Sequence, residues 1–283
     1  MLKATHLDGI VRFDLARGFA GHGLYFTTAY LVDDMMVDTG CAHTAPQLLD
    51  ALEGKTVRLV VNSHRHEDHI GGNGPLKRSR PDLRILAHPL ALPVLADPHR
   101  QQPMQIYRKV LWGWPEPTEA DPLEDGDVVE TEHHRFEVIH TPGHSPDHIC
   151  LYEPKMGWIF SGDLFVGGHD RALGSSYDIW QIVASLKKIA RLPANLLLPG
   201  CARVRHHPAE EIADKIDYLE SLGQRIIDLH KRGRSEAAIA RTVCGPAMPI
   251  EAITMGKFSR RNLVRSFLKG ADRDHWHSDP VAP

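Results

Sequence analysis

Three histidines and an aspartate lie within six positions, from His64 to His69, in a segment that reads H-x-H-x-D-H. Imidazole and carboxylate groups together suit ions such as Zn²⁺ and iron. In a loop, the alternate residues His64 and His66 can face one ion, while Asp68 and His69 are displaced along the turn and can face a second. The segment therefore predicts a metal centre, and the alternative is a solvated polar loop.

Three distant segments favour the metal centre. His144 lies in a T-P-G-H-S motif, Asp163 in S-G-D and Cys201 in P-G-C. Each follows a predicted apolar strand and has a glycine neighbour. Loops at strand ends are where a rigid scaffold presents functional side chains. We therefore expect these side chains to converge with the first motif.

In their order and context these segments resemble the metallo-β-lactamase superfamily, over about residues 20 to 208. The resemblance implies an α+β fold, a four-layer αββα sandwich with metal ions at one sheet edge, here followed by a small helical C-terminal appendage. It also implies the ligands: His64, His66 and His144 for metal one, Asp68 and His69 for metal two, and Asp163 bridging both.

Cys201 is where the chain departs from the family, whose last motif is usually Pro-Gly-His. Three interpretations remain open: the Cys201 thiolate binds metal two, the second site is weakened, or His206 or His207 supplies an imidazole instead. Thiolate ligation is favoured because thiolate binds Zn²⁺ well and needs no rearrangement of the chain.

The resemblance implies a binuclear metallohydrolase with two divalent ions, zinc being favoured over iron or manganese. A metal-bridging hydroxide would attack an ester, thioester or lactone, and Asp68 would accept or orient its proton. Penicillin hydrolysis is not expected, because the lactamases usually carry arginine at the position of His69. No convincing glutathione-binding set is found in the C-terminal part. The alternatives are a mononuclear-iron persulfide dioxygenase and a nuclease acting on RNA.

Five other residues are candidates near the site. Asp38, in a D-T-G turn, could hydrogen-bond a metal ligand, or only local amides. His169 is expected to be a surface histidine rather than a substrate contact. Tyr177 could donate to an oxyanion, and Trp112 and Trp114 could cover the site or belong to the core.

The remaining sequence divides into three parts: a catalytic domain at 1–205, a helical appendage at 206–270 and a mobile tail at 271–283. In the first part, apolar runs predict a hairpin around Asp33-Asp34, a buried strand at 57–62 and an irregular segment at 98–125. Pro208 predicts the start of a long helix ending at Arg232, with Gly233 as its stop.

Basic residues near the end of the appendage raise the question of RNA binding, although a solvated helix face is favoured. They are Lys257, Arg260, Arg261, Arg265, Lys269 and Arg273.

Composition limits the partners. Acidic and basic residues number 36 and 33, so the chain has no global attraction to nucleic acid or anionic membrane. No apolar run is long enough to span a bilayer, and no secretory signal is evident. The four cysteines are scattered, as is typical of a reducing cytoplasm. We expect a cytoplasmic protein with a small-molecule substrate and no membrane partner; a homodimer remains open.

Overall fold

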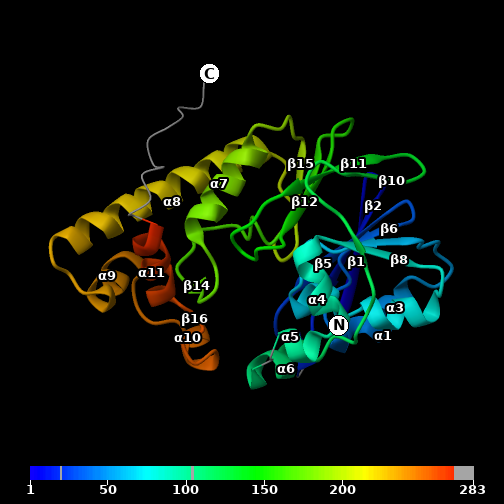
Figure 1. The fold of residues 1–283 in the computed structure, drawn as a ribbon, viewed down its shortest axis with the longest axis horizontal. Helices are drawn as coiled ribbons and strands as arrows, with labels where there is room; N and C mark the ends of the chain where they lie inside the picture. The colour runs from blue at the N-terminus through cyan, green and yellow to red at the C-terminus, as the bar shows by residue number, and fades with distance from the viewer. Residues whose placement is uncertain (20, 103–104, 271–283) are drawn as a thin grey trace.

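Two β-sheets face each other, and helices cover the outer face of each (Figure 1). The computed structural model describes residues 1–19, 21–102 and 105–270. The layers are helix, sheet, sheet and helix, and the predicted four-layer αββα sandwich of the α+β class is confirmed.

The first sheet has seven strands. The predicted hairpin around Asp33-Asp34 is confirmed, and Asp33 takes the left-handed backbone conformation that such a tight turn requires. The first four strands pair antiparallel and the last three parallel. In spatial order the strands are β1 (Leu2–Leu7), β2 (Ile10–Leu15), β5 (Thr27–Val32), β6 (Met35–Val37), β7 (Leu59–Val61), β8 (Arg84–Ala87) and β9 (Asp121–Pro122).

The second sheet has five strands, antiparallel except for its last pair. In spatial order they are β10 (Val128–Glu130), β11 (Arg135–His140), β12 (Ile149–Glu153), β13 (Trp158–Gly162) and β15 (Leu196–Pro199). Two short pairs lie outside the sheets: β3 (Gly18–Phe19) with β4 (His22–Gly23), and β14 (Leu173–Gly174) with β16 (Phe258–Ser259).

Apolar side chains fill three layers. Between the sheets, Tyr30 of β5 packs edge-on against Phe160 of β13, with ring centroids 5.2 Å apart. Outside the first sheet lie α1 (Ala45–Ala51), α3 (Asn73–Ser79) and α4 (Leu92–Ala96), whose apolar faces cover that sheet. Outside the second sheet lies α7 (Ile179–Ala190), capped by the Asp178 side chain. The result is a packed sandwich of two sheets between two layers of helices.

All but one of the C-terminal helices share one apolar cluster with α7 and β13; the exception is the short helix at 249–253, which has no buried residue. The long helix predicted to start at Pro208 is confirmed, and Gly233 follows its end with a positive φ. The boundary placed at residue 205 stays a prediction. These helices are α8 (Pro208–Lys231), α9 (Glu236–Cys244), α10 (Pro249–Ile253) and α11 (Arg260–Gly270).

One prediction about the fold is wrong: residues 98–125 are not irregular throughout. This segment contains α5 (Pro98–Gln101), α6 (Ile106–Trp112) and strand β9. Its prolines suggested a loop, yet Pro98 occupies the first turn of α5, where its missing N–H is not needed. The predicted mobile tail, residues 271–283, lies outside the described residues. No helix in the described part of the chain is both long and apolar enough to cross a membrane.

Candidate metal centre

The ends of several strands bring the predicted ligands to one edge of the sandwich. The H-x-H-x-D-H segment follows β7, and its last residues form the short helix α2 (Glu67–Ile70). His144 lies in the loop after β11, Asp163 follows β13, and Cys201 follows β15. In the second sheet β13 and β15 are parallel, and β11 runs the same way because β12 is antiparallel to both β11 and β13, so these three strands end on one side. The segment after β7 of the first sheet meets them there, where the Ile149 N–H donates to the Ser63 carbonyl at 2.8 Å.

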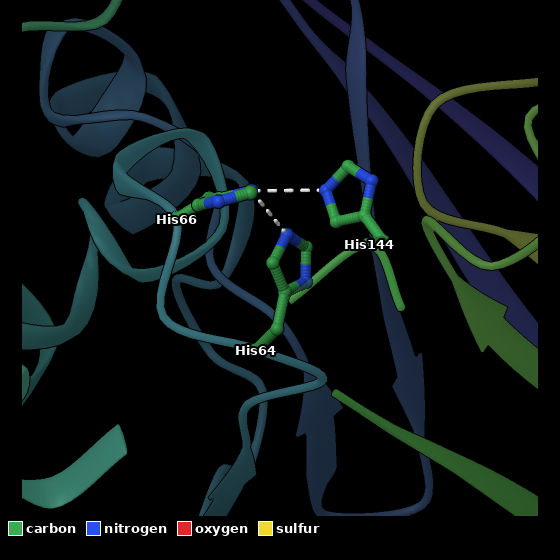
Figure 2. A group of neighbouring side chains, drawn as sticks. All are labelled: His64, His66 and His144. Carbon is green, nitrogen blue, oxygen red and sulfur yellow. Dashed lines mark hydrogen bonds between the residues drawn. The ribbon is translucent and has the colours of Figure 1, made fainter. Parts of the chain in front are cut away.

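Three histidine side chains converge on one point (Figure 2). His64 Nε2 lies 2.9 Å from His66 Nδ1, which in turn lies 2.9 Å from His144 Nε2. All three rings are largely withdrawn from solvent. Burial, with repulsion from neighbouring imidazoles, lowers the pKa of His64 and His66 well below the usual value and that of His144 to about 4. The rings are therefore neutral near pH 7, with lone pairs free to bind a cation.

A second group overlaps the first. Ligand atoms of His64, His69 and Asp163 all lie within 4.8 Å of one another. Asp163 turns one oxygen to each group, because Oδ1 is 3.5 Å from His69 Nε2 and Oδ2 is 3.5 Å from His144 Nε2. Asp68 Oδ2 lies 3.9 Å from His69 Nε2. Asp163 thus stands between the two groups.

Two buried atoms at this point have no hydrogen-bond partner among the described residues: His69 Nε2 and Asp163 Oδ1. Buried polar atoms are nearly always satisfied, because leaving them unpaired costs about 1–3 kcal/mol. A divalent cation between them would satisfy both. The donor set of imidazole and carboxylate therefore fits a metal ion.

Electrostatics at the second group also favour a cation. Burial alone would lower the pKa of His69, but the carboxylates of Asp163, Asp38 and Asp68 outweigh it and raise that pKa well above the usual value. Burial and the Asp163 charge raise the pKa of Asp68. This crowding of negative charge attracts positive charge, which a divalent ion can supply in place of a proton on His69.

Asp38 hydrogen-bonds a predicted metal ligand, which is the first of the two roles that the sequence suggested for it. Its Oδ2 lies 2.8 Å from His69 Nδ1, and it also accepts from the Ser63 N–H and hydroxyl, each at 2.7 Å. A neutral His69 that donates its Nδ1–H to Asp38 presents the Nε2 lone pair toward Asp163. Asp38 therefore orients His69 within the cluster.

Two positioning residues were missed in the sequence, Asp147 and His148. Buried Asp147 accepts the Arg65 N–H at 2.8 Å, and so connects the His144 loop to the H-x-H loop. His148 Nε2 accepts the Asp163 N–H at 3.1 Å, and burial lowers the pKa of His148 to about 3. The signal was available, because both residues complete the polar run that begins at His144, directly before a buried strand.

Cys201 borders the cluster without joining either group of three ligands. The preceding residue, Gly200, is so close that a Cβ there would lie 2.8 Å from His69 Cε1 and 2.9 Å from Asp163 Oδ1. Burial and the nearby Asp163 carboxylate raise the pKa of the Cys201 thiol well above its usual value. His206 and His207 are both exposed, and neither belongs to the cluster.

The other candidates separate by position. The Tyr177 ring centroid lies 4.3 Å from that of His144. Tyr177 and Trp112 both line a cavity that also borders His66, Asp68, His144 and Asp163. Trp114 does not line it but packs against His99, with ring centroids 4.0 Å apart. The expectation that His169 is a surface residue agrees with its exposure outside the cavity lining.

Part of the basic C-terminal set is neutralised within the fold. Arg260 Nε is 2.6 Å from Glu251 Oε1, and Arg265 Nε is 2.7 Å from Glu236 Oε2. Arg273 lies outside the described residues. These ion pairs leave less positive charge free for a phosphate backbone than the sequence suggested.

An αββα sandwich that gathers buried histidines and aspartates at the ends of its strands provides the donor groups of a metal-binding site. The chain belongs to the metallo-β-lactamase superfamily, whose family model matches residues 22–201.

A hydroxyacylglutathione hydrolase of Stenotrophomonas maltophilia is 31% identical over 173 residues, which are 59% of this chain and 57% of that protein. A similar hydrolase of Crocosphaera subtropica is 30% identical over 164 residues, 56% of this chain and 54% of that protein. The chain thus spans little more than half the length of these relatives.

Solved structures extend the likeness to almost the whole chain. A β-lactamase domain protein of Burkholderia ambifaria superimposes with a TM-score of 0.72 at 18% identity, over 94% of this chain and 87% of that one. A metallo-β-lactamase family protein of Thermus thermophilus superimposes with a TM-score of 0.67 at 18% identity, over 93% of this chain and 91% of that one. At this identity the likeness establishes the fold alone. A third structure, of TTHA1623 in a di-iron-bound form, superimposes with a TM-score of 0.53 at 29% identity, over 67% of this chain and 94% of that one.

Proposed function

We propose that the chain hydrolyses an ester, thioester or lactone with the help of two divalent metal ions. His64, His66 and His144 would hold one ion, Asp68 and His69 the other, and Asp163 both. The observation that carries the proposal is the position of Asp163, whose two carboxylate oxygens face the two ligand groups separately. That arrangement suits a carboxylate shared by neighbouring cations.

The chemistry follows from this donor set. When bound, such ions would lower the pKa of a water molecule and polarise the scissile carbonyl. The water adds its oxygen to the carbonyl carbon and the bond to the leaving sulfur or oxygen breaks. The products are an acid and a thiol or alcohol, or a single hydroxy acid from a lactone. Asp68 borders the reacting space and would accept or orient the proton that the attacking water loses. The names of the relatives add support for a thioester.

Elemental analysis combined with a substrate panel tests this proposal. The purified protein would be offered thioester, lactone, phosphodiester and persulfide substrates, with and without oxygen. We expect thioester or lactone turnover that continues without oxygen and stops when a chelator strips the metal. Bound iron with oxygen-dependent persulfide turnover would establish the dioxygenase instead, and turnover of the phosphodiester alone would establish the nuclease.

The role of Cys201 has its own experiment. If the thiolate binds metal two, as we propose, Cys201→Ala should retain about one metal ion per chain, while Cys201→His should retain two and remain active. The physical reason is that imidazole and thiolate are both good ligands for zinc. Two tightly bound ions in Cys201→Ala would exclude ligation by the thiolate.

A further inference from the structure

A cavity of about 210 Å³ opens directly onto the metal cluster. At one end it is lined by His66, Asp68, His144 and Asp163. Its other walls are largely apolar, and they include Leu111, Trp112, Leu164, Leu173, Ile250 and Phe258. A substrate whose reacting group lies at the cluster would therefore extend the rest of its structure between these side chains.

The C-terminal segment supplies part of this wall. Ile250 belongs to α10 and Phe258 to β16, and the pairing of β16 with β14 holds them over the catalytic domain. The polar side chain of Thr254, which also lines the cavity, is occupied by its own segment, because its hydroxyl donates to the Ile250 carbonyl at 2.8 Å. Of the four lining residues from the appendage, Ile250 and Phe258 are therefore apolar, Thr254 is satisfied within its own segment, and the fourth is Lys215.

The two cations in the cavity lining already have carboxylate partners. Arg108 of α6 pairs with buried Glu67, and Lys215 Nζ lies 2.6 Å from Asp170 Oδ2. Lys215 also donates to the Gly168 carbonyl at 2.9 Å. An anionic substrate tail would have to compete with these carboxylates, and the cost would be highest at Arg108, because Glu67 would be left buried and unpaired.

From these walls and these paired charges we propose that the cavity binds an apolar acyl group, so that the substrates are esters or thioesters of hydrophobic acids. The inference rests on the proposed hydrolase function and adds the substrate class to it. Ile250 and Phe258, both from the appendage, are the specificity-determining residues. A thioester of a charged peptide such as glutathione would be a poorer substrate.

A series of thioesters with one leaving thiol and straight acyl chains of increasing length tests the inference. Each methylene buried contributes about 0.8 kcal/mol, so kcat/KM should rise up to about fourfold per added methylene until the cavity is full. Binding of octanamide to the metal-loaded enzyme, followed by calorimetry, gives a readout without turnover and should show a negative heat-capacity change.

Two variants of α10 form a matched pair. Ile250→Ala should raise KM for the octanoyl thioester and lower the octanoyl-to-acetyl ratio of kcat/KM by about threefold or more, because it removes apolar wall. Ile253→Ala, three residues along the same helix, should keep the wild-type ratio, since Ile253 is 55% exposed and does not line the cavity. Ile250→Trp should move the optimum to a shorter chain.

The outcomes distinguish the two proposals. If the metal-loaded enzyme hydrolyses no ester, thioester or lactone, the proposed function itself fails. If it hydrolyses acyl thioesters with a rate that does not depend on chain length, or prefers the glutathione thioester, only the apolar substrate class is wrong. Equal chain-length profiles for Ile250→Ala and Ile253→Ala would show that Ile250 does not determine the specificity.

Discussion

Asp38 offers the sharpest test of how the second metal ligand is oriented. Its carboxylate accepts three hydrogen bonds, two from Ser63 and one at the His69 Nδ1. In Asp38→Asn one oxygen becomes an NH₂ donor. The Ser63 backbone N–H can only donate, so the amide oxygen must face it, and the NH₂ group must face the Ser63 hydroxyl and His69. His69 Nδ1 then has to accept, which moves the imidazole proton to Nε2.

That proton would prevent His69 from binding a metal ion, because Nε2 is the atom that faces the cluster, 3.5 Å from Asp163 Oδ1. A protonated nitrogen has no lone pair for a metal. Loss of an outer partner of this kind lowers metal affinity by about 10- to 100-fold. This corresponds to about 1.4–2.8 kcal/mol, at about 1.4 kcal/mol per tenfold. We expect the loss to fall on the second equivalent of metal, since His69 belongs to the second group only.

Competition against a chelator of known affinity measures both equivalents. Asp33→Asn is the control, because Asp33 and Asp38 both take positive φ values, 49° and 60°, which asparagine tolerates. Asp33 contacts Thr131 and His133 rather than the cluster. If Asp38→Asn and Asp33→Asn bind the second ion equally well, the reasoning from the His69 tautomer is refuted.

Three further predictions concern stability. Phe267→Ala should lower the free energy of unfolding, measured in urea, by about 3–5 kcal/mol, because the ring is fully buried against Trp180. A decrease of less than about 1 kcal/mol would contradict this packing. Asp33→Asn should cost about 1 kcal/mol near pH 7. Although burial opposes it, hydrogen bonds from Thr131 and His133 lower the folded-state pKa of Asp33. The wild-type advantage is therefore fully present above the unfolded pKa of about 3.9 and is lost as the pH falls through the lower folded value; a difference that does not change with pH down to the acid transition would count against it. Removal of metal should lower the melting temperature, by the equivalent of about 2.7 kcal/mol where free metal had been at 100 times its Kd. An unchanged melting temperature would argue against a buried ion.

Much of the fold and of the candidate site could be predicted from the sequence. The ligand types and their order, the hairpin at Asp33 and the helix from Pro208 depend on local chemistry: side-chain donor atoms, turn geometry and the fixed φ of proline. The α+β sandwich followed from the same motifs through their resemblance to a family. Such features depend on neighbouring residues, so a linear reading can find them.

Tertiary structure decided the rest. Three features depend on contacts between residues far apart in the chain. Asp163 faces both ligand groups, His148 positions Asp163, and the appendage forms a cavity wall through Ile250. Such contacts arise from how two sheets and their covering helices pack, and no local pattern encodes the distance between them. The sequence by itself determined which atoms were available to a metal and a substrate, and packing decided which of them meet.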